Sequence, residues 1–236
     1  MPARTFNVTA RTLTALGLAG GLPLLAFVLL VGRSDDKSRL WFGGAALYSL
    51  VVLAFMVRYR ANVAVATLQV LMLLLLAESL RREISTAPPR WVAMAAFVAG
   101  FGGLYEALDR LGPGSAWESV LQLGTFAVLQ VVLVALIVRV RRRIPSRGLA
   151  IVAVGLLATA STNVVRAVLT VAQGRMPAIN DFTPLTNLAF VVLMLTLVSL
   201  NFGYGGFVLE KTRLRQLRDA EEKARAQARQ QVAEAY

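Results

Sequence analysis

The chain has 236 residues, 57% of them apolar and 16% charged, and its mean hydropathy of +0.63 lies outside the range of soluble domains. The net charge of +12 would point to nucleic acid in a soluble protein, but most of it lies beside apolar stretches, where it can contact anionic lipid, so we expect no nucleic-acid partner. The absence of cysteine and histidine excludes disulfides, thiolate or haem ligation and phosphorylation on histidine. We therefore predict a membrane protein with no catalytic residue, metal or cofactor of its own.

Seven apolar stretches are long enough to cross a bilayer, which takes about 20 helical residues. They cover residues 12–31, 40–57, 62–80, 91–108, 118–138, 149–172 and 185–209. The sequence thus predicts an all-α protein, with a seven-helix membrane bundle over residues 1–209 and a charged tail helix over 210–236 that continues the last span. Seven spans place the two termini on opposite sides of the membrane.

The first stretch follows Arg4 and Arg11, a pattern that also fits a signal peptide holding the N-terminus inside. No convincing small-residue cleavage site comes after it, so we interpret it as a span and keep a six-span bundle as the main alternative. Gly17 and Gly21 form a GxxxG pair within it. Such a pair predicts close helix packing, either within the chain or in a dimer.

Basic residues are distributed unequally between alternate loops. Of the 25 lysines and arginines, 18 lie on the side of the tail, including the run at residues 139–143. Positively charged loops stay in the cytoplasm, so we predict an outside N-terminus and a cytoplasmic C-terminus. We interpret the run at 139–143 as a topology anchor at the inner headgroups, with specific recognition of anionic lipid as the alternative.

The positions of the lysines exclude a retinal pigment. Lys37, Lys211 and Lys223 are the only lysines, and all lie outside the predicted membrane core, where a Schiff base would be needed. Glu78 precedes Arg81 by three residues at the inner end of the third span. This spacing predicts an ion pair along one helix.

Polar side chains gather toward the predicted outer face. Ionisable groups within a membrane are costly unless they are paired or hydrated. The candidate residues are Arg166, Glu106, Glu118, Gln122 and Asn163. We hypothesise that Arg166 and one of the two glutamates line a water-accessible outer pocket for a small ligand or an ion. The alternative is a structural ion pair, or an Arg166 side chain that reaches the headgroups.

The last span begins at a well-marked position, where Thr183 suits an N-cap and Pro184 the first helical residue. Near its inner end lie Gly203, Gly205 and Gly206. Each should weaken a helix by about 1 kcal/mol relative to alanine. The two interpretations are a flexible joint between bundle and tail, and tight packing against a neighbouring helix.

The tail carries a weak seven-residue repeat. Its apolar positions, the candidate seam of a coiled coil, are Leu214, Leu217, Ala224 and Ala228. Glutamate and glutamine also occupy the seam, so a parallel homodimer held by it would be marginal, and a single exposed helix is the alternative. The pattern runs to Tyr236 without a helix-ending glycine or proline. We expect an output domain to follow.

The exit segments SLNFGY at 199–204 and EKTRLR at 210–215, after an arginine late in the sixth span, carry a family resemblance. The chain resembles the N-terminal seven-transmembrane sensor region of bacterial sensor histidine kinases and membrane diguanylate cyclases. The resemblance implies a sensory domain in the bacterial cytoplasmic (inner) membrane that passes a stimulus through the last span to a cytoplasmic module. The long tail favours a histidine kinase of a two-component system. Neither family's catalytic motif is present.

Two other classes fit the same features. A small transporter or channel is one, although the spans contain no obvious inverted repeat. A scaffold subunit that recruits a soluble partner through its tail is the other. In each case the bilayer is a partner, and the stimulus, whether a small ligand or the state of the membrane, is not specified by the sequence.

Overall fold

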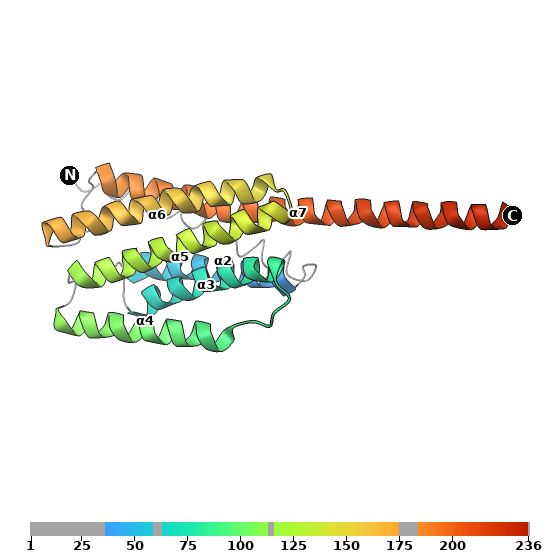
Figure 1. Ribbon diagram of the computed structural model, residues 1–236. Coiled ribbons are helices and arrows are strands. Elements are labelled where there is room, and N and C mark those ends of the chain that lie inside the picture. Colours follow the sequence, from blue (N-terminus) through green and yellow to red (C-terminus); the bar gives the residue numbers. More distant parts are fainter. Residues whose placement is uncertain (1–35, 59–62, 113–115, 175–183, 236) are drawn as a thin grey trace.

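The computed structural model describes residues 36–58, 63–112, 116–174 and 184–235 (Figure 1). Within these residues every regular element is an α-helix, which confirms the all-α prediction for this part of the chain. The helices are α2 (Asp36–Arg58), α3 (Val63–Ile84), α4 (Trp91–Leu111), α5 (Ala116–Arg143), α6 (Arg147–Gln173) and α7 (Pro184–Ala235). The first predicted span, the GxxxG pair and Thr183 lie outside the described residues.

Among the described helices, α3, α4, α5, α6 and α7 are long and apolar enough to cross a membrane. Their outward faces carry large apolar side chains, such as Val131, Val154 and Val168. In water so much exposed apolar surface would favour aggregation, whereas lipid tails solvate it. Length, composition and surface therefore agree on a multi-pass helical membrane protein.

At the end of the bundle from which the tail leaves, which we call the tail end, helices α2, α3, α5 and α6 all extend beyond the predicted spans. Helix α5 continues through its terminal arginines to Arg143, and α6 already starts at Arg147. Hydropathy falls at these arginines, but arginine has a high helix propensity and its side chain reaches headgroups from within a helix. The Ser146 hydroxyl caps α6 by accepting a hydrogen bond from the Leu149 amide at 3.1 Å.

Five of the described helices, α2, α3, α5, α6 and α7, contact one another in a closed circuit, and α4 lies outside it. Helix α3 contacts α2, α4 and α5, while α6 lies between α5 and α7, and α7 returns to touch α2 (Figure 1). Helix α4 is at the edge of the bundle, and only Met94, Phe101 and Tyr105 of it are buried. The core is therefore built mainly by the other five helices.

Helices α6 and α7 approach each other closely at glycines. A Cβ atom on Gly203 would lie 2.6 Å from the carbonyl oxygen of Gly148 and equally near Val152, and one on Gly155 would lie 3.2 Å from the Ser199 Cβ. Small residues of this kind let backbones touch in a membrane, where packing replaces the hydrophobic effect. Gly203 thus fits the packing interpretation of the glycine segment.

Helix α7 has two parts with different surroundings. Its first part packs in the bundle, and beyond residue 211 every described side chain of the tail is exposed. Figure 1 shows the tail projecting straight out of the bundle as a continuation of the same helix. The point where α7 leaves the bundle is therefore the only mechanical link between them within the described chain.

Candidate functional site at the exit of helix α7

The helix remains continuous through the glycine segment. Gly203, Gly205 and Gly206 all lie within the 52-residue helix α7, with no break assigned at any of them. Gly205 has open space where a side chain would project, whereas Gly203 contacts α6. The structure thus gives these glycines different surroundings, and the flexible joint stays a prediction.

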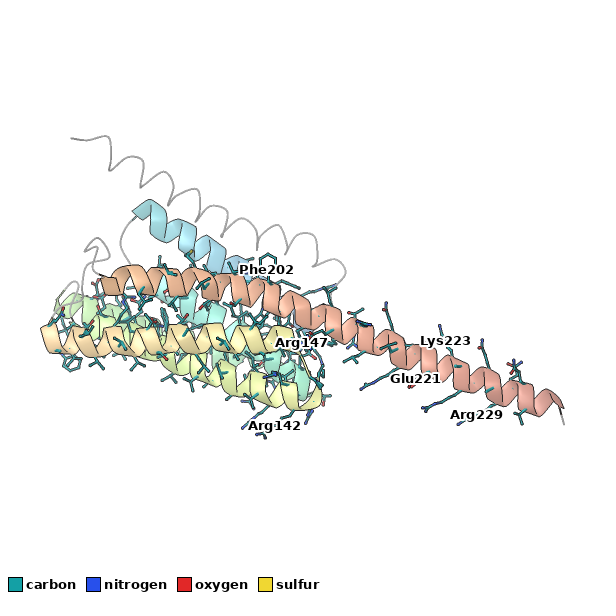
Figure 2. All side chains as sticks on the ribbon, turned by 90° about the horizontal axis from the view of Figure 1, so that it is seen from above. Arg142, Arg147, Phe202, Glu221, Lys223 and Arg229 are labelled. Carbon is teal, nitrogen blue, oxygen red and sulfur yellow. The ribbon has the colours of Figure 1, made fainter. Side chains whose placement is uncertain are left out.

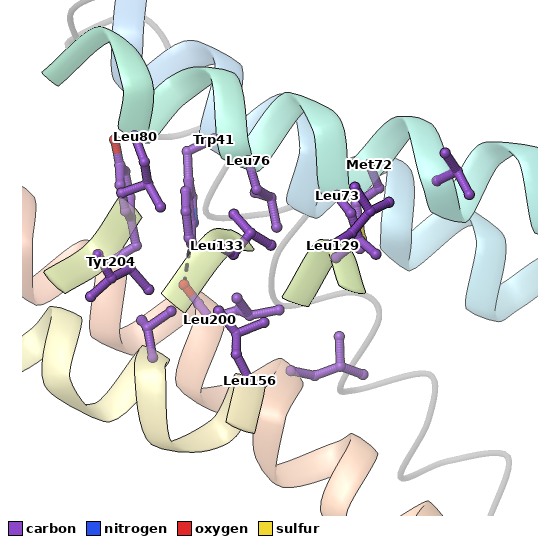
Figure 3. Close-up of a cluster of buried hydrophobic side chains, with 14 of the residues drawn as sticks. Trp41, Met72, Leu73, Leu76, Leu80, Leu129, Leu133, Leu156, Leu200 and Tyr204 are labelled. Atoms are coloured by element: carbon purple, nitrogen blue, oxygen red, sulfur yellow. Dashed lines mark hydrogen bonds between the residues drawn. The ribbon is translucent and has the colours of Figure 1, made fainter. Parts of the chain in front are cut away.

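Tyr204 forms the centre of an aromatic cluster immediately before the exit. Its ring stacks on Trp41 of α2, with centroids 4.1 Å apart and an interplanar angle of 6°, and it meets Phe42 edge-on at 5.8 Å. The Trp41 indole N–H donates to the Leu200 carbonyl oxygen at 3.3 Å, the dashed line in Figure 3. These contacts fasten α7 to α2 although the two helices otherwise touch little.

A hydroxyl pair connects the aromatic cluster to α3. The Ser79 hydroxyl donates to the carbonyl oxygen of Lys37 at 2.7 Å, and it lies 3.2 Å from the Tyr204 hydroxyl. A serine hydroxyl has one proton, so Tyr204 is the donor in the second bond. Ser79 therefore joins α2, α3 and α7 at one point.

A buried carboxylate completes the junction. The side chain of Glu83 of α3 is 2% exposed. It forms an ion pair at 2.6 Å with Lys211 of α7, whose side chain is 9% exposed. Lys37 of α2 lies 3.9 Å from the other carboxylate oxygen. We call Lys37, Glu83 and Lys211 the junction triad. In a site with little water such a pair is held strongly, because losing one partner leaves a buried charge without compensation.

Helix α6 contributes a further contact at the same level. The backbone N–H of Arg147, the first residue of α6, donates to a carboxylate oxygen of Glu210 at 3.4 Å. A carboxylate at a helix N-terminus is favourable because the first amides there lack intrahelical partners. Successive residues of α7, Glu210 and Lys211, therefore contact different helices of the bundle.

The sequence alone did not indicate the junction triad. Two of the chain's three lysines belong to it, and their placement at the predicted inner ends of spans was visible. Their common partner Glu83 is 128 positions from Lys211, and nothing local relates them. The predicted pair of Glu78 with Arg81, three residues apart, is confirmed at 2.6 Å.

The predicted outer residues lie at the far end of the bundle, opposite the tail, and they pair with other partners than expected. Glu106 forms an exposed ion pair with Arg110 of its own helix at 3.0 Å, and the buried Glu118 hydrogen-bonds Tyr105 of α4. Among the described residues, none forms an ion pair with the half-buried Arg166. The structure therefore does not bring Arg166 together with either glutamate, and the ligand pocket stays a prediction.

The two predicted amides bridge neighbouring helices. Gln122 of α5 donates to Gln69 of α3 at 3.2 Å, and Asn163 of α6 donates to Gln130 of α5 at the same distance. Thr196 of α7 adds a hydrogen bond to the Gly155 carbonyl of α6 at 2.8 Å. Each of these contacts satisfies polar groups across one helix interface, so they hold helices together in lipid.

The seam residues lie on the isolated tail. Leu214 and Leu217 are 39% and 53% exposed, and Ala224 and Ala228 are exposed as well. Among the described residues they contact no second helix. Pairing of two tails stays a prediction.

Fold and site define a multi-pass helical membrane protein whose last helix continues outward as a tail. No protein-family model matches the chain, and comparisons with curated proteins and with solved structures found no similar one. The sensor families named above therefore remain a resemblance.

Proposed function

We propose that the chain is the membrane-embedded sensory region of a bacterial signal-transduction protein of the cytoplasmic membrane. A sensor histidine kinase is the favoured full-length protein, and a membrane diguanylate cyclase is the alternative. The observation that carries the proposal is the exit of α7, where one helix bears the contacts to α2, α3 and α6 and continues into an exposed tail. At 1.5 Å per residue, the tail carries a displacement about 36 Å beyond the junction.

A signalling function needs two bundle states, and a stimulus must differ in affinity between them. The junction triad suits this requirement because the ion pair between its two buried side chains, Glu83 and Lys211, is either made or broken. A shift of α3 relative to α7 that separates Glu83 from Lys211 would change both the rotation and the freedom of the tail. The small ligand or membrane stimulus would act on the bundle, and the tail would report it.

The distribution of charge supports a cytoplasmic tail. The basic ends of α3 and α5 meet at the tail end, where Arg143 donates to the Ile84 carbonyl oxygen at 2.9 Å. The N-terminus of α6 lies at the same end, where the Arg147 backbone N–H donates to the Glu210 carboxylate. Positive charge concentrated at one end of a bundle favours that end inside. A reporter joined after Tyr236 should be active only as a cytoplasmic fusion.

Homodimerisation through the tail is part of the proposal and is testable because the chain has no cysteine. Ala224→Cys lies on the predicted seam, and Ala226→Cys lies on the opposite face of the same turn. Oxidation in native membranes should crosslink the first variant at least about fivefold more than the second, since only seam positions face each other. Equal crosslinking of both would contradict a specific parallel pair.

The signalling proposal itself is tested by joining a histidine-kinase catalytic module after Tyr236. We expect Glu83→Gln to change kinase output by about fivefold or more, the usual lower range of coupling between sites. Glu106→Gln, which removes an exposed pair at the far end, should leave output unchanged. Unaltered output in both variants, together with solute flux in proteoliposomes, would favour a transporter instead.

A further inference from the structure

A basic groove opens at the tail end between the end of α3, the loop that leads to α4 and the end of α5. It has a volume of about 600 Å³, and five arginines line it. They are Arg81, Arg90, Arg139, Arg142 and Arg143. No acidic side chain and no lysine belong to the described lining. The groove is separate from the junction triad and has no part in the contacts that hold α7.

Two of these arginines shape the groove. Arg81 forms hydrogen bonds with both carboxylate oxygens of Glu78, at 2.8 and 2.6 Å, and donates to the Pro88 carbonyl oxygen at 2.8 Å. Arg143 donates to the Ile84 carbonyl oxygen at 2.9 Å. These bonds hold the α3–α4 loop against the end of α5. The wall of the groove is therefore preorganised by contacts within the protein.

The other three arginines are available to a ligand. Arg90, Arg139 and Arg142 are exposed, and within the described part of the chain none of their side chains has an ion pair or hydrogen bond. Arg139 and Arg142 are three residues apart on α5 and so share a face of that helix. Figure 2 shows Arg142 projecting from the end of α5, away from the bundle. Glu78 compensates only one of the five positive charges, which leaves a strong local preference for an anion.

We propose that the groove binds the phosphate group of an anionic phospholipid. Guanidinium groups present forked donors that match two phosphate oxygens, which a lysine ammonium does not, and every cation of the lining is an arginine. Basic pockets between helix ends at the cytoplasmic side are the type of site that holds such headgroups. The predicted role of the run at residues 139–143 as a general anchor becomes, in this proposal, a specific site.

Apolar neighbours favour a lipid over free phosphate. Ile84 and Leu136 line the groove together with the arginines, so it offers contact to the glycerol and upper acyl carbons as well as to the phosphate. Trp91, which follows Arg90, lines a separate apolar groove between α3 and α4. Tryptophan is enriched at headgroup level in membranes. Inorganic phosphate would use only the charged part of this surface.

The test measures lipid affinity in a neutral detergent, where no charged membrane surface contributes. The purified protein is titrated with fluorescent phosphatidylglycerol, with phosphatidylcholine as the zwitterionic comparison. In the double variant Arg139→Gln/Arg142→Gln, affinity for phosphatidylglycerol should fall about 30-fold, because each arginine near an anionic headgroup contributes a factor of about five. The matched control Arg213→Gln/Arg218→Gln removes the same charge from the exposed tail and should change affinity less than twofold, about the effect of unspecific attraction.

A further variant, Arg139→Lys/Arg142→Lys, keeps the charge and should recover only part of the affinity if forked donors matter. Neither arginine side chain has a partner within the described chain, so thermal unfolding without lipid should be the same in all variants. Equal losses in the groove and tail variants would overturn the proposal in favour of diffuse attraction. Displacement of the labelled lipid by millimolar inorganic phosphate would overturn the lipid assignment, and equal binding of phosphatidylcholine would do so as well.

Discussion

The two ends of the bundle are held together by different chemistry. At the tail end, charged groups from distant parts of the chain meet in the junction triad, with Glu83 buried between Lys37 and Lys211. Toward the far end, neutral amides join helices, as in the pair of Gln122 with Gln69, and the buried Glu118 bonds the neutral Tyr105 hydroxyl. Neutral hydrogen bonds in a membrane contribute little each, whereas a buried charge without its partner is costly. The end that carries the tail is therefore the one built to respond to a single broken contact.

The largest effect is expected from Glu83→Gln. This change removes the charge that faces the buried Lys211 at 2.6 Å, and the free energy of unfolding should fall by about 3–5 kcal/mol. Glu106→Gln is the matched control at the far end, where loss of an exposed pair should cost at most about 1 kcal/mol. Denaturant unfolding in mild detergent measures both. If both variants lost the same free energy of unfolding, the two ends of the bundle would not differ in their dependence on a single ion pair.

The rescue of this variant sharpens the same comparison. Replacing both partners, as in Glu83→Leu/Lys211→Met, removes the buried charges together and should restore most of the lost stability. The ion pair between α7 and α3 is nevertheless absent from this double variant. Signalling output should therefore stay altered although the free energy of unfolding recovers. Recovery of both properties would show that packing alone links α7 to α3.

An intermediate effect is expected within the glycine segment. Gly203→Ala places a Cβ 2.6 Å from the Gly148 carbonyl oxygen and forces α6 and α7 apart, at a cost of about 1–3 kcal/mol. Gly205→Ala meets nothing within 4 Å and should stabilise the helix by up to about 1 kcal/mol. The two variants differ by two positions, so opposite changes in thermal midpoint would separate packing from helix propensity. A shift of the same sign in both would contradict the close contact.

The smallest effect is expected away from the junction. Thr196→Val removes the hydrogen bonds to the Gly155 carbonyl and to the Thr159 hydroxyl while keeping the side-chain shape, and should cost about 0.6 kcal/mol for each, the average for such bonds in membranes. Thr212→Val is the control, because that exposed hydroxyl bonds only within its own helix, to Val208. A cost near that of Glu83→Gln would mean that neutral contacts are as decisive as charged ones.

Local patterns predicted much of the architecture. The all-α class of the described residues, five helices long and apolar enough to cross a membrane, the start of α7 at Pro184 and the pair of Glu78 with Arg81 follow from hydropathy and spacing. The predicted ends of helices were less accurate, as at Arg143, because hydropathy marks where a side chain leaves lipid and not where helical hydrogen bonds stop. The partners of Glu106 and Glu118 could not be read from the sequence for a related reason. The helix rise gives an estimate of depth along a span, but it does not give the direction of each side chain around its helix.

Membrane character and helix positions were thus determined by the sequence itself, because burial in lipid depends on the apolarity of each segment and not on its neighbours. Which helices touch, and at which rotation, was decided only by tertiary packing. That packing brings Glu83 to Lys211 across 128 positions, turns Gly203 rather than Gly205 toward α6, and gathers arginines of α3 and α5 around one groove. These contacts depend on the complementary shape of faces far apart in the chain, which no local pattern contains.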